Sequence, residues 1–134
     1  MYLVDTNVWL ECLPEQAQAA EVGGFLNRIP ASELYLTDFA FHSICVVLMR
    51  LNPAAALLDF ARDLFIDGAV ELVSVSPEET QTVIDTMRRY SLDFDDAHQY
   101  AVVEKYNLMI VSFDRDFNRP PRGRKAPAEI LATP

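Results

Sequence analysis

Four short apolar runs, separated by longer amphipathic stretches, constrain the fold of this chain more than any other feature of its sequence. The runs YLV, ELYL, VELVSV and LMIVSF occupy residues 2–4, 33–36, 70–75 and 108–113. Each is too short for a helix and is typical of a buried strand. Strands that alternate with helices predict an α/β fold, a three-layer sandwich with a mainly parallel central sheet. The last run is mostly apolar, so we expect it at the centre of that sheet.

Helices are predicted between these runs because apolar residues recur there every three or four positions. The residues expected to begin or end helices are Pro14, Asp38, Asn52 with Pro53, Gly68, Ser76 with Glu79, and Asn107. Ser and Asp side chains cap the first turn of a helix, Gly and Asn often end one, and Pro suits the first helical position. The helix over 38–51 is apolar on several sides, which predicts that a second copy of the chain covers part of it in a homodimer.

Length and composition set the general class of protein. The chain has 134 residues, of which 51% are hydrophobic, and this suits one folded domain over residues 1–134. No apolar run approaches the roughly 20 residues that span a bilayer, and the start has no secretion signal, so we expect a cytoplasmic protein without membrane contact. Cys12 and Cys45 have no partners at metal-ligand spacing, and we interpret both as buried thiols that contribute to packing.

The charge is unevenly distributed along the chain. The net charge is −9, but residues 115–134 carry five basic and two acidic side chains. This basic C-terminal segment contains Arg119, Arg122, Arg124 and Lys125. It could be a solubilising tail or could bind an anionic ligand, and composition alone leaves both interpretations open.

Three carboxylates are expected to meet at one edge of the sheet. Asp5 and Asp114 follow the first and last predicted strands, and Asp96 lies in the first turn of a helix that enters the same edge. Like charges gathered from distant segments repel one another unless a cation compensates, and Mg²⁺ or Mn²⁺ prefers such oxygen ligands.

The neighbouring acidic residues have local explanations. Asp95 suits a helix cap and Asp116 a turn. For Asp93 we also prefer a local role, with support of the metal ligands as the alternative, and Asp116 has the alternative of an additional metal ligand. His98 points about 200° around the helix from Asp96 and is expected on the surface.

These motifs resemble the PIN domain family, and more narrowly its small members typified by VapC toxins of bacterial toxin–antitoxin pairs. The family's first motif, an Asp that ends the first strand followed by Thr or Ser and Asn, is matched by Asp5, Thr6 and Asn7. The later motifs are matched by FDDA at 94–97 and SFDRDF at 112–117. The resemblance covers nearly the whole chain.

The resemblance implies metal-dependent endonucleolytic cleavage of RNA. Asp5, Asp96 and Asp114 would be catalytic and would hold one or two Mg²⁺ or Mn²⁺ ions, while Asn7 and Ser112 would orient them. A water nucleophile would leave 5′-phosphate and 3′-hydroxyl ends. The basic residues of 115–134 would bind the RNA backbone, and a small antitoxin would insert its tail into the acidic groove, with an Arg in place of the metal charge.

One position departs from the family pattern. The family usually has a Glu in the helix after the second strand, and His42 occupies the matching position here. His42 is either a metal ligand, a neutral group that orients water or phosphate, or a buried histidine bonded to a carbonyl. Asp38 lies one turn earlier and could supply the missing charge, although capping is its simpler role.

Other functions remain as alternatives. A PIN-like domain that has lost catalysis could bind RNA or a protein partner. A haloacid dehalogenase-like phosphatase would need Asp-x-Asp after the first strand, where Asp5 is followed by Thr6 and Asn7. A phosphoacceptor receiver domain would need a Lys at the end of a late strand, whereas Lys105 lies within a predicted helix.

Overall fold

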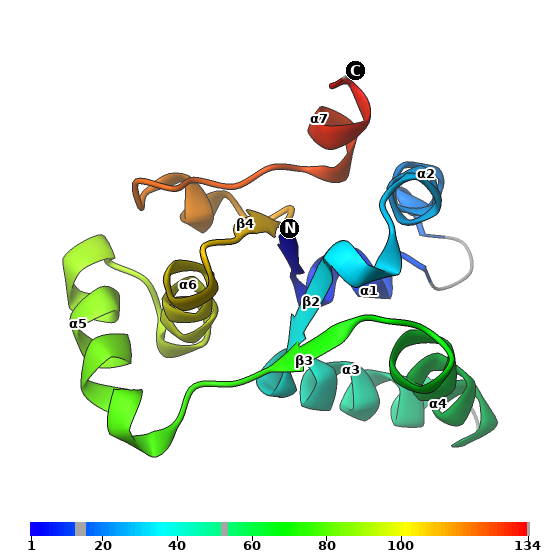
Figure 1. Ribbon diagram of the computed structural model, residues 1–134, viewed down its shortest axis with the longest axis horizontal. Helices are drawn as coiled ribbons and strands as arrows, with labels where there is room; N and C mark the ends of the chain where they lie inside the picture. Colours follow the sequence, from blue (N-terminus) through cyan, green and yellow to red (C-terminus); the bar gives the residue numbers. More distant parts are fainter. Residues whose placement is uncertain (13–15, 52–53, 134) are drawn as a thin grey trace.

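A four-stranded parallel sheet forms the centre of the molecule (Figure 1). The structure, a computed structural model, describes residues 1–12, 16–51 and 54–133. The strands are β1 (Tyr2–Val4), β2 (Leu34–Thr37), β3 (Glu71–Val73) and β4 (Met109–Val111). Their order across the sheet is β3-β2-β1-β4. The four strands are those predicted from the apolar runs.

The position of β4 differs from the prediction, because it lies at an edge of the sheet and not at its centre. Its apolar character has another cause. The C-terminal segment covers this edge, where Ser112 donates its backbone N–H to the carbonyl of Lys125 and Lys125 donates to that of Ile110. An edge strand that is covered in this way is buried like a central one.

Helices cover both faces of the sheet and complete three layers. One face carries α1 (Thr6–Leu10), α2 (Ala19–Arg28), α3 (Asp38–Leu51), α4 (Ala54–Ala61) with the adjoining turn η2 (Arg62–Ile66), and α7 (Pro127–Leu131). The other face carries α5 (Thr80–Tyr90) and α6 (Phe94–Tyr106). The short turns η1 (Ala31–Glu33), η3 (Pro77–Glu79) and η4 (Arg115–Asn118) connect them. Among the described residues, no helix is long and apolar enough to cross a membrane.

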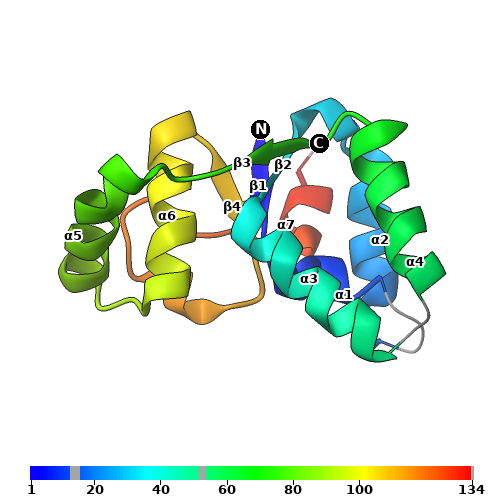
Figure 2. The same ribbon diagram turned by 90° about the horizontal axis from the view of Figure 1, so that it is seen from below.

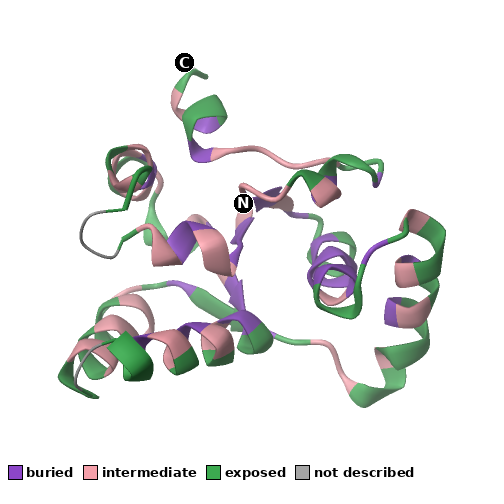
Figure 3. Cartoon of the chain, turned by 180° about the vertical axis from the view of Figure 1, so that it is seen from behind, coloured by how far each residue is buried: buried purple, intermediate pink, exposed green. Residues whose placement is uncertain are grey.

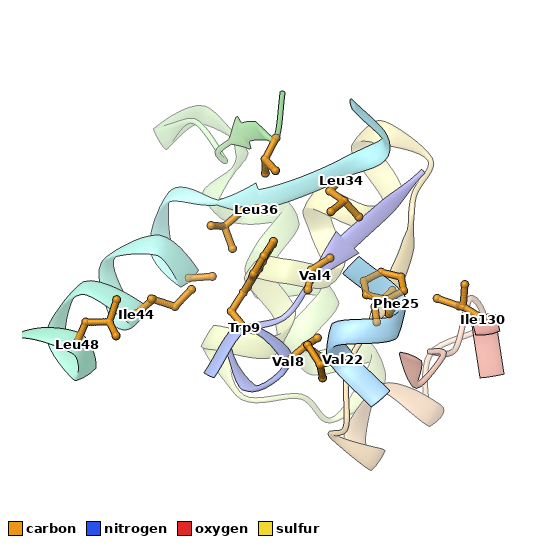
Figure 4. Packing of buried hydrophobic residues seen from close by; sticks show 13 residues of the cluster. Val4, Val8, Trp9, Val22, Phe25, Leu34, Leu36, Ile44, Leu48 and Ile130 are labelled. Atoms are coloured by element: carbon orange, nitrogen blue, oxygen red, sulfur yellow. The ribbon is translucent and has the colours of Figure 1, made fainter. Parts of the chain in front are cut away.

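Alternate side chains of β1 divide the core into two clusters. Leu3 packs with the α5 and α6 side, and Val4 packs with the α1 to α4 side, as a pleated strand requires. Figure 4 shows the second cluster, in which Trp9, Phe25 and Ile44 fill the space between the sheet and its helices. Figure 3 shows that α6 is buried over most of its length. α6 is therefore part of the core on its side of the sheet.

Several predicted helix boundaries are confirmed. Ser76 and Glu79 form the expected capping box, with 2.8 Å between Ser76 Oγ and Glu79 Oε1. Asn107 ends α6 in the left-handed conformation at φ 54°. Gly68 follows η2, and a Cβ there would lie only 2.4 Å from the carbonyl oxygen of Asp63. The predicted roles of Pro14, Asn52 and Pro53 fall outside the described residues.

Four local predictions are wrong. Asp93, and not Asp95, caps α6, because its Oδ1 accepts the N–H of Asp96 at 2.8 Å. Thr37 fills the capping role expected of Asp38, since its Oγ1 accepts the N–H of Ala40 at 3.0 Å, while Asp38 is the first residue of α3. Cys12 is exposed, and the predicted helix over 14–29 begins only at Ala19 in the described chain.

Candidate metal centre

The carboxyl ends of the strands meet at one edge of the sheet, beside an open groove of about 310 Å³. Figure 2 shows the start of α6 and the turn η4 at the same end of the molecule as α1. The acidic residues that line the groove are Asp5, Asp95, Asp96 and Asp114. Residues separated by about ninety and more positions in the chain therefore converge here, as expected for the ligand site of a parallel sheet.

Asp5 is buried and held by three hydrogen bonds. Its Oδ1 accepts the N–H of Thr6 at 2.7 Å and the Nε2 of Gln99 at 2.8 Å. Its Oδ2 accepts the hydroxyl of Ser112 at 2.7 Å. These donors favour the ionised carboxylate and fix its orientation. Burial nevertheless raises the pKa of Asp5, and the nearby charge of Asp114 raises it further.

The hydroxyl of Ser112 links two of the acidic residues. It donates to Asp5 and accepts the backbone N–H of Asp114 at 2.9 Å. The Nδ2 of Asn7 lies 3.4 Å from the same oxygen, and Asn7 Oδ1 accepts the N–H of Phe113 at 3.4 Å. Ser112 thus contacts the Asp5 carboxylate and the backbone of Asp114, and Asn7 contacts Ser112 and the backbone of Phe113. This arrangement ties the end of β1 to the end of β4.

Asp96, Asp114 and Asp116 form the tightest acidic group. One carboxylate oxygen from each lies within 4.8 Å of the others, which is the grouping expected of residues that share a metal ion. Asp114 Oδ1 accepts the N–H of Asp116 at 2.9 Å, so the turn η4 presents both side chains together. Asp116, for which we preferred a turn role, is therefore close enough to share a cation. Asp5 lines the same groove without belonging to this group.

Among the described residues, no basic side chain offsets the charge of Asp96. Burial, followed by repulsion from Asp93, Asp114, Asp5 and Asp116, raises the pKa of Asp96 to about 7. No Lys or Arg is among the described residues that line the groove. The available donors are carboxylate oxygens, which suit Mg²⁺ or Mn²⁺ better than softer metals. The residues therefore fit a divalent cation.

In the absence of metal, the stability of the protein should depend on pH through Asp96. Its pKa of about 7 in the folded state exceeds the unfolded value of about 3.9, so the folded protein binds the proton more tightly. Ionisation therefore destabilises the fold, with no penalty below about pH 4 and the full penalty above about pH 7. In EDTA, the melting temperature of Asp96→Asn should exceed that of the wild type near pH 8. The two melting temperatures should converge towards pH 4. A difference between them that stays constant with pH would show that ionisation of Asp96 is not its cause.

The α3 wall of the groove contains no carboxylate among the described residues. Phe39 and Ser43 line it, whereas His42 is exposed and does not. The interpretation of His42 as a buried histidine is wrong, and the structure does not bring it to the acidic group as a ligand. Asp38 is exposed and also lies outside the lining. The helix is rotated so that the residue after His42 faces the groove.

Sequence reasoning missed Gln99 and misplaced His98. Gln99 is 5% exposed, donates to Asp5, and leaves its Oε1 without a partner among the described residues. It follows Asp96 by three positions and therefore shares its helix face, which is the signal that could have found it. His98 is half-buried, with its ring centroid 5.9 Å from that of Phe39, and is not a surface residue as predicted.

The basic side chains of the C-terminal segment mainly contact other residues of the same chain. Arg119 pairs with Asp116 at 3.1 Å and donates to the carbonyls of Tyr90 and Ser91. Arg122 donates a hydrogen bond to Asn107 Oδ1, and Arg124 donates one to the carbonyl of Ser112. The backbone of Lys125 forms a β-bridge with Val111. None of the four lines the groove. Their role in binding RNA stays a prediction.

Several solved structures share the fold of this chain. A toxin–antitoxin complex from Klebsiella pneumoniae aligns with a TM-score of 0.77 and 16% identity, over 95% of this chain and 98% of that chain. VapC20 of Mycobacterium tuberculosis, described as a sarcin–ricin loop cleaving toxin, gives 0.73 and 19%, over 88% and 93%. FitAcB from Neisseria gonorrhoeae gives 0.72 and 17%, over 96% and 99%.

Sequence comparison addresses the family directly. No curated protein gives a significant match to the chain. The model of the PIN domain family matches residues 2–123, which include the whole sheet and every acidic residue of the groove. The chain therefore belongs to the PIN domain family.

Proposed function

We propose that this protein is a metal-dependent endoribonuclease and the toxin of a toxin–antitoxin pair. The observation that carries the proposal is the close group of Asp96, Asp114 and Asp116. Two of its members, Asp96 and Asp114, line a groove together with the anchored Asp5 at the carboxyl edge of a PIN-domain sheet. RNA is the substrate class named for one protein of the same fold, the sarcin–ricin loop cleaving toxin.

The carboxylates would hold the cation, and their neighbours would keep them in place. Asp96, Asp114 and Asp116 are the closest ligands, and Asp5 borders the same groove. When bound, Mg²⁺ or Mn²⁺ lowers the pKa of an attacking water and neutralises charge on the scissile phosphate. Asp93 fixes the backbone of Asp96, and Ser112 fixes both Asp5 and the N–H of Asp114. Such supporting contacts keep ligands in a productive geometry.

The surface of the protein and the proteins of the same fold support two protein partners, a second copy of the chain and an antitoxin. Val46, Met49 and Leu51 on α3 and Leu58 on α4 are exposed, on two helices that pack against each other. Exposed apolar side chains on adjoining helices support a homodimer.

The second partner is a small antitoxin. A basic side chain of the antitoxin that enters the acidic groove would compete with the metal, and the antitoxin would act in the cytoplasm with the toxin.

One observation favours the alternative of a domain that binds RNA or protein without cleaving it. The described part of α3 contributes Phe39 and Ser43 to the groove and no carboxylate. A site with fewer acidic ligands binds a divalent cation more weakly, and a weakly bound cation would reduce the rate. The same assay decides between the two functions.

The test is cleavage of a mixed-sequence single-stranded RNA by the purified protein with Mg²⁺ or Mn²⁺. We expect internal cuts with 5′-phosphate and 3′-hydroxyl ends, and we expect EDTA to stop the reaction. Ligation of adaptors that require each type of end identifies the products. Metal binding by calorimetry without any cleavage would support the binding domain, and cleavage that persists in EDTA would contradict the metal-dependent mechanism.

A further inference from the structure

The α3 wall of the groove carries an exposed phenyl ring. Phe39 is 40% exposed and lines the groove together with Asp5, Asp96 and Asp114. Leu10 adds a second apolar side chain to the lining. The groove therefore has acidic and apolar parts, and these would suit different parts of one ligand. An anionic group bridged by a cation suits the first, and a flat uncharged group suits the second.

Phe39 is positioned by hydrogen bonds near its backbone and by one contact of its ring. Its backbone lies in the first turn of α3, where its N–H donates to Asp38 Oδ1 at 2.8 Å and Thr37 caps the helix. The imidazole of His98 lies against the ring, with 5.9 Å between centroids and an angle of 46° between the planes. A ring supported by a neighbouring ring keeps one orientation, and that lowers the entropy lost when a ligand stacks on it.

We propose that Phe39 is a stacking platform for a nucleobase of single-stranded RNA, next to the phosphate that the acidic group addresses. The proposal rests on the proposed ribonuclease function and adds a residue that binds the substrate through a base. A base has an uncharged aromatic face, so it can bind beside carboxylates that would repel a phosphate, and stacking is a common way to hold single strands.

The charge of the protein makes this contact important for substrate affinity. The net charge is −9, and no described Lys or Arg lines the groove, so the backbone of RNA meets no complementary charge there except a bound cation. Stacking is independent of charge and would supply binding that phosphate contacts do not. Because a paired base has its faces covered by its neighbours, a duplex cannot use the platform.

The first experiment measures steady-state cleavage of one oligoribonucleotide, alone and annealed to its complement. Phe39→Ala should raise KM for the single strand by about 10- to 100-fold with kcat little changed. The reason is that stacking stabilises the bound substrate and the transition state equally, so its loss weakens binding without slowing the bound complex. Tyr106→Ala is the matched control. Its ring is also 40% exposed, but Tyr106 is the last residue of α6, whereas the groove lies at the first turn of that helix. The ring of Tyr106 lies near that of Tyr35. This control should leave KM unchanged.

A second experiment detects stacking without relying on cleavage. In Phe39→Trp, the introduced indole should be quenched when the single strand is added with Mg²⁺ in a stopped-flow mixer, and not when the duplex is added. The natural Trp9 is only 3% exposed and contacts Phe60, so its emission in the wild type serves as the baseline. Quenching by the single strand alone supports the platform.

The two readouts separate the platform from the enzyme. Quenching without cleavage by the wild type would retain the platform and reject the ribonuclease. Cleavage by the wild type with an unchanged KM in Phe39→Ala, or equal quenching by single strand and duplex, would overturn the platform and leave the ribonuclease intact. Absence of both quenching and cleavage would overturn both.

Discussion

Asp96→Asn is expected to lower the rate of RNA cleavage by more than about 100-fold and to abolish saturable Mn²⁺ binding at millimolar concentrations. Asp96 is buried at the centre of the acidic group, within reach of Asp114 and Asp116. Loss of a supporting hydrogen bond alone commonly costs 10- to 100-fold, and loss of a direct ligand should cost more. Calorimetric titration with Mn²⁺ and a single-turnover cleavage assay would measure the two effects.

The control for this variant is Glu104→Gln, which removes a carboxylate from the same helix. Glu104 is exposed and does not line the groove. It should leave cleavage and metal binding at wild-type levels. Since Asp96→Asn relieves charge repulsion, it should fold at least as well as the wild type without metal. Full activity in a folded Asp96→Asn protein would exclude this acidic group as the catalytic centre.

Ser112→Ala is expected to reduce both stability and activity, although Ser112 carries no charge. Its buried hydroxyl donates to Asp5 Oδ2 and accepts the N–H of Asp114. Removing it leaves a carboxylate oxygen and an amide without these partners, at a cost of about 1–3 kcal/mol in the free energy of unfolding. Cleavage should fall by about 10- to 100-fold because the ligands lose their support. Urea denaturation and cleavage assays give the two values.

Thr86→Val tests whether any buried hydroxyl would have the same effect. Thr86 is 6% exposed, and its hydroxyl donates at 2.8 Å to the carbonyl of Thr82 within α5. This change preserves the shape of the side chain and touches no residue of the groove, so activity should be unaffected. If Ser112→Ala lost stability but cleaved RNA at the wild-type rate, the link between Ser112 and the acidic group would have no catalytic importance.

Local chemistry explains the parts of the fold that could be predicted from sequence. Each of the four strands is an apolar run, and the capping box of Ser76 and the left-handed Asn107 depend on residues only a few positions apart. The convergence of Asp5 and Asp114 followed from the parallel direction of the strands, which all end at one edge, and that of Asp96 from the helix that begins there. Periodicity could not show that β4 is an edge strand, because its burial comes from Lys125 and the segment around it.

The sequence by itself determined the α/β class, the succession of elements and the acidic residues of the groove. Tertiary structure decided which other side chains line the groove beside the acidic residues. The rotation of α3 directs Phe39 and Ser43 inwards and leaves His42 exposed, and a shift of one residue turns a helix by about 100°. Gln99 reaches Asp5 across 94 positions of sequence. Such contacts depend on how helices pack against the sheet, and packing is a property of the whole chain.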